Sequence, residues 1–206
     1  MIQARNRLEM NLPNALTLSR IVLSPVFMVF LLIEEPRFLY VALALFAVAA
    51  LTDVYDGHLA RRMGALTSFG KFMDPVADKL LVSMALIGFL ARDVPGLPGW
   101  MVVVIIAREL VITGFRSLAA FRGLVITSSR MARVKTVLQM SLVAWILGQM
   151  ALAGHLGQLW YGETRWGRSP GDLILVGLLW STVCLTTVSG LDYLLRNRAV
   201  LRGALR

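Results

Sequence analysis

Four aspartates within a short stretch of the chain are the residues best suited to chemistry. They are Asp53, Asp56, Asp74 and Asp78, the first two three residues apart and the last two four apart. On a helix, residues at these spacings share a face, so each pair presents two carboxylates side by side. Two such faces opposite each other would form a box of oxygen ligands.

Charge balance predicts what fills this box. Four ionised carboxylates gathered at membrane depth would repel one another and lose their hydration, which costs far more than the ~1 kcal/mol of a surface charge contact. Protonation of the carboxylates would relieve this cost, and so would two divalent cations, whose four positive charges balance four negative ones. Oxygen ligands on helices suit Mg²⁺ or Mn²⁺. A solvated acidic helix face is the alternative in a soluble protein, but ionisable groups buried inside a membrane are usually functional. Whether the chain is a membrane protein or a soluble protein therefore decides between the two interpretations.

Composition places the chain among polytopic membrane proteins. Of its 206 residues, 57% are hydrophobic and only 16% are charged, and the mean hydropathy is +0.71. The net charge of +9 is spread between apolar segments rather than gathered in a basic stripe. This pattern argues against a nucleic-acid partner and favours anionic lipid head groups and phosphorylated substrates. The single cysteine, Cys184, excludes an internal disulfide.

The apolar segments predict an all-α membrane protein: one domain over residues 1–206, with six transmembrane helices after a short N-terminal juxtamembrane segment. The expected spans cover about 14–33, 38–62, 70–91, 99–121, 134–153 and 173–195. A basic loop at 122–136 and a polar loop at 155–171 separate the later spans. The second span ends with one aspartate pair and the third opens with the other. Both pairs are therefore expected at one membrane end, on antiparallel neighbours.

Basic residues predict the orientation of these spans. One side of the membrane would collect Arg5, Arg7, Arg61, Arg62, Lys71, the basic residues of 122–135 and those of the C-terminal tail. The other side would hold only Arg37, Arg92, Arg165 and Arg168. Because loops rich in lysine and arginine stay in the cytoplasm, both termini and the aspartates are expected to face the cytoplasm.

The residues around the aspartates resemble the signature of the CDP-alcohol phosphotransferase family. Every position of that signature is matched, at its fixed spacing, by Asp53, Asp56, Gly57, Ala60, Arg61, Gly70, Asp74 and Asp78. Further segments are similar to the bacterial subgroup that makes phosphatidylglycerophosphate: Asn11-Leu12-Pro13-Asn14, Asp74-Pro75-Val76-Ala77-Asp78-Lys79, Ile106-Ala107-Arg108-Glu109 and Val134-Lys135-Thr136. The resemblance thus extends over most of the chain and is weaker after Met150.

The resemblance implies a metal-dependent phosphatidyltransferase of the bacterial cell membrane, acting as a homodimer in the lipid bilayer. Its donor would be CDP-diacylglycerol and its acceptor glycerol 3-phosphate, giving phosphatidylglycerophosphate and CMP. Two Mg²⁺ or Mn²⁺ ions would be held by Asp53, Asp56, Asp74 and Asp78, with Asp78 also the general base. The CDP donor would be bound by Asp56, Gly57, Ala60, Arg61 and Gly70. Close helix packing is an alternative reason for the small residues.

A phosphorylated acceptor requires a basic pocket, and the candidates are Arg108, Arg116 and Lys135. They lie near the cytoplasmic end of the fourth span and the start of the fifth. Anchoring at the membrane surface is the alternative role for basic residues, but it fits poorly for Arg108, which lies inside an apolar run. Glu109 and Arg116 are seven residues apart and share a helix face, so an ion pair between them is a further alternative.

Other functions stay open at this point. The same chemistry could serve another acceptor, such as phosphatidylglycerol in cardiolipin synthesis, an inositol phosphate or serine. A divalent-cation transporter could use the same aspartates, but it would show inverted repeats and an ion path through both leaflets. Here the carboxylates are expected at one membrane end only.

Overall fold

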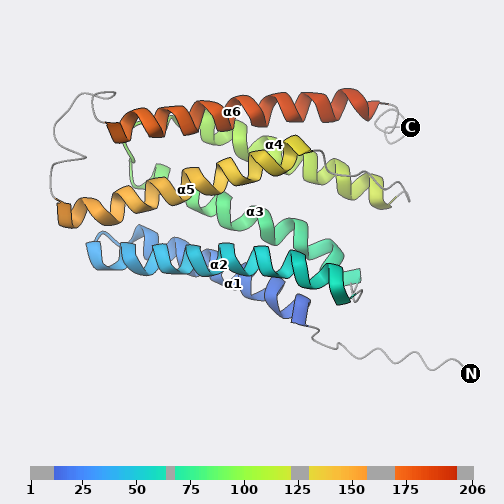
Figure 1. Ribbon diagram of the computed structural model, residues 1–206, viewed down its shortest axis with the longest axis horizontal. Helices are drawn as coiled ribbons and strands as arrows, with labels where there is room; N and C mark the ends of the chain where they lie inside the picture. Colours follow the sequence, from blue (N-terminus) through green and yellow to red (C-terminus); the bar gives the residue numbers. More distant parts are fainter. Residues whose placement is uncertain (1–11, 64–67, 122–129, 157–169, 199–206) are drawn as a thin grey trace, which may run out of the picture.

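The computed structural model describes residues 12–63, 68–121, 130–156 and 170–198. Within these ranges the chain contains no strand and forms an elongated bundle (Figure 1). Its helices there are α1 (Leu12–Leu32), α2 (Pro36–Met63), α3 (Ser68–Ala91), α4 (Gly99–Phe121), α5 (Arg130–Leu156) and α6 (Pro170–Arg196). The all-α prediction is confirmed for the part of the chain described.

Helix α5 begins earlier than the sequence pattern predicted. The predicted loop at 122–136 is wrong in its second half, because Arg130, Arg133 and Lys135 lie on the first turns of α5. Neither glycine nor proline interrupts residues 130–147, and arginine, lysine, alanine and methionine are strong helix formers. The predicted loop at 155–171 is also shorter, since α6 opens at Pro170, a residue favoured at the first helical position. Residues 157–169 lie outside the described ranges.

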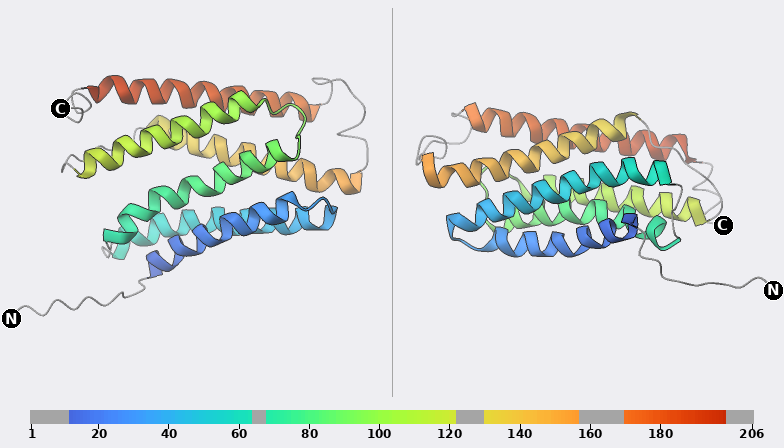
Figure 2. Two further views of the ribbon diagram at one scale, coloured as in Figure 1. Left: turned by 180° about the vertical axis from the view of Figure 1, so that it is seen from behind. Right: turned by 60° about the horizontal axis from the view of Figure 1, so that its bottom comes forward.

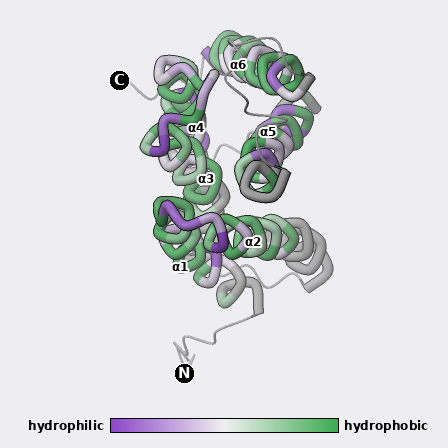
Figure 3. Tube along the Cα trace, turned by 90° about the vertical axis from the view of Figure 1, so that its left-hand side faces the viewer, coloured by the Kyte–Doolittle hydropathy of each residue, from purple (hydrophilic) through white to green (hydrophobic). Residues whose placement is uncertain are grey.

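Two stretches of helix within the described ranges are long and apolar enough to cross a membrane: Arg133–Leu152 and Gly171–Arg196. Shorter apolar stretches are Thr17–Leu32, Pro36–Thr52 and Lys79–Ala91. Hydrophobic residues colour much of the bundle when it is viewed end-on (Figure 3). The coarse prediction of membrane-spanning helices is thus supported for α5 and α6, while six crossings stay a prediction.

The helices alternate in direction along the bundle. Consequently α1, α3 and α5 start, and α2, α4 and α6 finish, at the same end, here called the signature end (Figures 1 and 2). Helix α1 packs against α2 and α3, α5 packs against α2, α3 and α6, and α4 packs against α3 and α6. The contact between α2 and α3 themselves is smaller than the contact of each with α1. The backbones carrying the two aspartate pairs therefore lie at one end, as predicted.

Apolar packing and backbone capping join α1 and α3 at the opposite end. A Cβ on Gly88 would lie 2.5 Å from Cδ2 of Leu31, so the missing side chain of Gly88 makes room for Leu31 as it stands. Leu31 and Phe89 are fully buried there. Arg92, in the turn after α3, donates from Nη1 to the carbonyl oxygens of Leu31 and Ile33 at 2.9 and 2.8 Å. These bonds satisfy carbonyls that the end of α1 leaves without helical partners.

Candidate active site

The aspartate pairs lie on continuous helix near the signature end. Asp53 and Asp56 belong to the second half of α2, and Asp74 and Asp78 to the first half of α3. The helical backbone needed to place each pair on one face is therefore present. The side chains of the predicted metal and donor residues lie outside the described part of the chain: Asp53, Asp56, Gly57, Ala60, Arg61, Gly70, Asp74 and Asp78.

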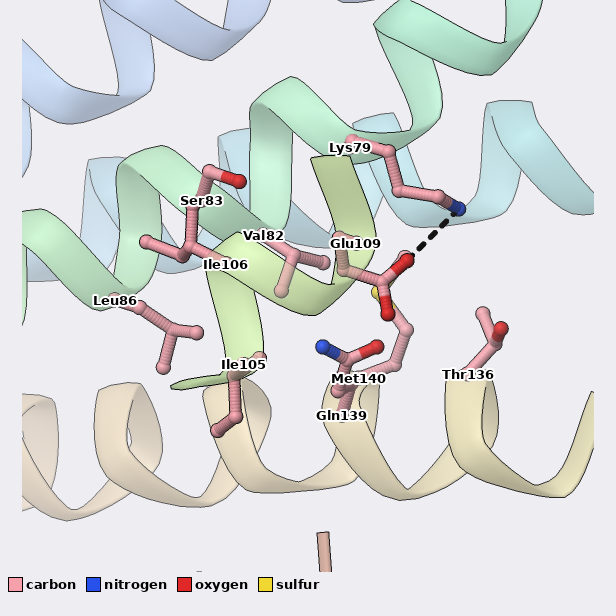
Figure 4. A pocket seen from close by; sticks show the side chains of 10 residues that line it. All are labelled: Lys79, Val82, Ser83, Leu86, Ile105, Ile106, Glu109, Thr136, Gln139 and Met140. Atoms are coloured by element: carbon pink, nitrogen blue, oxygen red, sulfur yellow. Dashed lines mark ion pairs between the residues drawn. The ribbon is translucent and has the colours of Figure 1, made fainter. Parts of the chain in front are cut away.

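An ionic cluster is centred on the buried Glu109 of α4, and Figure 4 shows Glu109 with one of its partners, Lys79 of α3. Glu109 Oε1 accepts a hydrogen bond from Lys135 Nζ of α5 and a second, of 3.3 Å, from Arg108 Nη1. Glu109 Oε2 lies 3.7 Å from Lys79 Nζ of α3. The side chains of Glu109 and Lys135 are only 7% and 3% exposed, so solvent screens their attraction weakly. These four residues are called the Glu109 cluster below.

Arg108 also connects the cluster to α6. Its Nη2 donates a 2.9 Å hydrogen bond to Ser189 Oγ, and the Ser189 hydroxyl donates to the carbonyl oxygen of Thr186 at 3.1 Å. The adjacent Gly190 lies directly against the arginine side chain, since a Cβ there would be 3.1 Å from Arg108 Cγ. Within the described residues, the buried Nε of Arg108 has no hydrogen-bond partner.

A cavity of about 90 Å³ opens beside the cluster, between α3, α4 and α5 (Figure 4). Its polar lining consists of Lys79, Ser83, Glu109, Thr136 and Gln139. Its apolar lining consists of Val82, Leu86, Ile105, Ile106 and Met140. Gln139 is buried, and its amide nitrogen finds no partner among the residues described. The cavity is polar and large enough to hold water molecules or a small polar group.

The structure brings together two of the three predicted acceptor residues. Arg108 and Lys135 meet at the same oxygen of Glu109. Arg116 lies two turns further along α4, exposed and within electrostatic reach of Tyr193 on α6. The alternative of a direct Glu109–Arg116 ion pair is wrong, because no such pair occurs between these two described residues. Arg116 is seven residues from Glu109, which corresponds to about 10 Å along the helix. Lys135 and Arg108, in contrast, both contact the Glu109 carboxylate.

Sequence reasoning missed Lys79 as a member of the cluster and Glu109 as its centre. Lys79 directly follows Asp78 and Glu109 directly follows Arg108, each next to an apolar run, and charge at such positions was the available signal. It also missed Ser189 and Gly190 on α6. A serine and a glycine are ordinary in an apolar helix, so nothing in the sequence connects them with Arg108.

The sequence model of the CDP-alcohol phosphatidyltransferase family matches residues 10–188. This range includes both aspartate pairs and the Glu109 cluster. The chain belongs to the CDP-alcohol phosphatidyltransferase family. The family prediction made from the signature residues is therefore confirmed.

Similar proteins in several bacteria carry related names. The CDP-diacylglycerol–glycerol-3-phosphate 3-phosphatidyltransferase of Bacillus subtilis (strain 168) is 37% identical over 208 residues, covering 93% of this chain and 97% of that protein. The probable phosphatidylglycerophosphate synthase of Mycobacterium tuberculosis (strain H37Rv) is 38% identical over 189 residues, covering 90% and 81%. The Escherichia coli (strain K12) 3-phosphatidyltransferase is 37% identical over 146 residues, covering 68% and 78%.

Proposed function

We propose that this family member transfers the phosphatidyl group from CDP-diacylglycerol to glycerol 3-phosphate, giving phosphatidylglycerophosphate and CMP. Family membership and the names of the relatives support this reaction. The Glu109 cluster supports a phosphorylated acceptor independently. Among the described side chains, three cations surround a single carboxylate, so this part of the site has two more positive than negative charges. A phosphate dianion would balance that excess.

The chemistry assigns separate tasks to residues of the chain. The acceptor hydroxyl oxygen attacks the phosphorus that carries diacylglycerol, the bond from that phosphorus to CMP breaks, and CMP leaves with its electron pair. Asp78 takes the hydroxyl proton. Arg108 and Lys135 hold the acceptor phosphate, so that the hydroxyl is in line with the breaking bond. Arg116 would attract the acceptor from its exposed position nearer the end of α4.

We propose that two Mg²⁺ or Mn²⁺ ions are held by Asp53, Asp56, Asp74 and Asp78. Carboxylate oxygens are the ligands these ions prefer, and α2 and α3 bring both pairs to the signature end. Bound ions supply charge neutralisation to the diphosphate of the donor. The CDP part would contact Asp56, Gly57, Ala60, Arg61 and Gly70, whose small members permit close approach to the backbone.

The proposed setting is a bacterial inner membrane, crossed six times by a homodimeric enzyme whose signature end and termini face the cytoplasm. The shortest and longest helices have 21 and 28 residues, which corresponds to about 31 and 42 Å and spans a ~30 Å hydrocarbon core. Large apolar side chains such as Val29, Val103 and Leu173 are at least 60% exposed. Lipid would cover them.

The decisive experiment is release of CMP by the purified protein in detergent. The protein receives CDP-diacylglycerol, Mg²⁺ or Mn²⁺, and one acceptor from a panel of glycerol 3-phosphate, glycerol, phosphatidylglycerol, inositol phosphate and serine. We expect CMP with glycerol 3-phosphate and none with glycerol, which lacks the phosphate. Release with another acceptor but not with glycerol 3-phosphate would reject the acceptor, and release with none would reject the reaction.

Two variants of α5 test the phosphate site within this assay. Lys135→Ala removes the buried cation, and we expect it to raise KM for glycerol 3-phosphate far more than KM for CDP-diacylglycerol. Arg133→Ala removes an exposed cation from the same helix and should change neither KM by more than about twofold. Equal effects of the two variants on the acceptor KM would contradict the role of Lys135.

A further inference from the structure

Helix α6 contributes none of the predicted catalytic or binding residues, yet it is the helix against which Arg108 lies. The contact has two parts. Ser189 is 5% exposed, and its hydroxyl accepts the hydrogen bond from Arg108 Nη2 while donating its own proton to the backbone. Because the hydroxyl proton is committed to Thr186, the serine oxygen is oriented to accept from the arginine.

The second part of the contact is the missing side chain of Gly190. A Cβ at this position would lie 3.1 Å from Cγ and 3.2 Å from Nε of Arg108, which is tighter than most carbon contacts in proteins. An added methyl group would therefore push the arginine side chain by a few tenths of an ångström. Gly177, on the same helix, faces open space within 4 Å. Close packing alone thus does not explain every glycine of α6.

We propose that Ser189 and Gly190 are positioning residues that hold Arg108 in the conformation that binds the acceptor phosphate. This inference rests on the proposed function, which places Arg108 in the phosphate site. The arginine is confined by the Glu109 carboxylate, the Ser189 hydroxyl and the backbone of Gly190. Its Nε stays uncommitted within the described part of the chain. A guanidinium fixed before the ligand arrives loses little conformational entropy on binding.

Matched glycine variants test the inference in the CMP-release assay. Gly190→Ala should raise KM for glycerol 3-phosphate about threefold or more, because Arg108 must shift by a few tenths of an ångström and a full 1 Å misplacement of a positioning group costs about 100-fold. Gly177→Ala makes the same change on the same helix without touching Arg108, and it should stay within about twofold of the wild type. KM for CDP-diacylglycerol should stay within about twofold in both variants.

Ser189→Ala provides a second test that adds no volume. Removing the hydroxyl should raise the acceptor KM about threefold, since it frees the arginine without displacing it. A double variant then shows whether Gly190 acts through Arg108. In an Arg108→Ala background, Gly190→Ala should change the acceptor KM by less than about twofold, because the group it displaces is gone.

The outcomes separate this inference from the proposed function. Wild-type protein that releases no CMP with glycerol 3-phosphate would reject the proposed function. An active wild type in which Gly190→Ala and Gly177→Ala behave alike would overturn only the positioning role. So would a Gly190→Ala effect that persists without Arg108, a donor KM that rises as much as the acceptor KM, or a Ser189→Ala enzyme with unchanged kinetics.

Discussion

Arg92 and Arg108 show how one residue type serves two purposes at two places in the same bundle. Arg92 uses Nη1 for two backbone carbonyls at the end of α1. Those partners need a donor whatever else the protein binds. Arg108 instead meets a carboxylate and a hydroxyl, and its Nε has no partner within the described residues. The first arginine completes the fold, whereas we propose that the second binds a ligand.

Glycines repeat the comparison. Gly88 admits Leu31 between α1 and α3, and Gly190 admits Arg108 between α4 and α6. The device is the same, because a missing Cβ makes room for a long side chain from the neighbouring helix. The consequence differs with the side chain that packs against the glycine. Disturbing Leu31 should lower stability, and disturbing Arg108 should alter acceptor binding.

The largest expected effect is on turnover and contrasts the two ends of α3. Asp78→Asn removes the proposed base and one proposed metal ligand from the first half of the helix. We expect CMP release to fall by about 100-fold or more, as when a group that acts in the transition state is lost. Release is measured at saturating donor, acceptor and Mg²⁺. Activity near that of the wild type would remove Asp78 from the mechanism.

Asp93→Asn is the matched control for that substitution. Asp93 follows the other end of α3 and has a positive φ of 48°, a conformation that asparagine also adopts readily. Folding and turnover should both be preserved. Loss of activity in both variants would mean that the assay reports helix integrity rather than chemistry.

The next effect concerns the Glu109 cluster and is thermodynamic. Glu109→Gln keeps the shape of the side chain but leaves the buried Lys135 without its carboxylate partner. Breaking a buried ion pair at one partner costs about 3–5 kcal/mol. We therefore expect a markedly lower melting temperature in detergent, measured at a fixed scan rate.

Glu34→Gln is the control for this variant, because Glu34 is exposed between α1 and α2. Exposed substitutions of this kind change stability by about 0.5 kcal/mol or less. A Glu109→Gln protein as stable as the Glu34→Gln protein would show that the cluster is not held together by its carboxylate. Arg108 and Lys135 could then no longer be distinguished, by their dependence on Glu109, from charges with no partner in the fold.

The two regions also differ in how far the sequence predicts them. The aspartate signature lies within residues 53–78, where helical spacing alone relates one carboxylate to the next. The Glu109 cluster joins residues that are 26 positions apart, and Arg108 meets Ser189 across 81 positions. Those contacts depend on how α4 rotates against α5 and α6. No local pattern encodes that rotation, so the basic residues were recognised but their shared partner was not.

Fold prediction failed where charge was taken as a sign of a loop. Arg130 and Arg133 suggested a basic connection, yet both lie on α5, since arginine favours helix when no breaker intervenes. The bounds of the helix at 99–121 were predicted correctly because the turn before it contains Pro95, Gly96 and Pro98. Proline and glycine end a helix through their local backbone preferences, whereas a helix that begins with charged residues depends on its tertiary surroundings.

A smaller effect on stability distinguishes the contact of Gly88 with Leu31 from the contact of Gly190 with Arg108. Gly88→Ala forces the fully buried Leu31 to shift, and overpacking of this kind costs about 1–3 kcal/mol. The melting temperature should fall while both KM values stay unchanged. Gly148→Ala, where nothing lies within 4 Å of the added carbon, should leave stability unchanged or raise it through helix propensity. A change in acceptor KM with Gly88→Ala would contradict the view that Gly88 affects stability alone and that only Gly190 affects acceptor binding.

The smallest expected effect concerns the cavity beside the cluster. Gln139 has a buried amide nitrogen with no partner in the described part of the chain, and an unpaired polar group of this kind contributes nothing to stability. Gln139→Leu replaces it with an apolar side chain of similar size, so stability should stay the same or rise by about 1 kcal/mol. The melting temperature in detergent checks this. A fall in stability equivalent to about 2 kcal/mol would show that the amide is paired with water in the cavity. The cavity, like Arg92, would then stabilise the fold rather than bind a ligand.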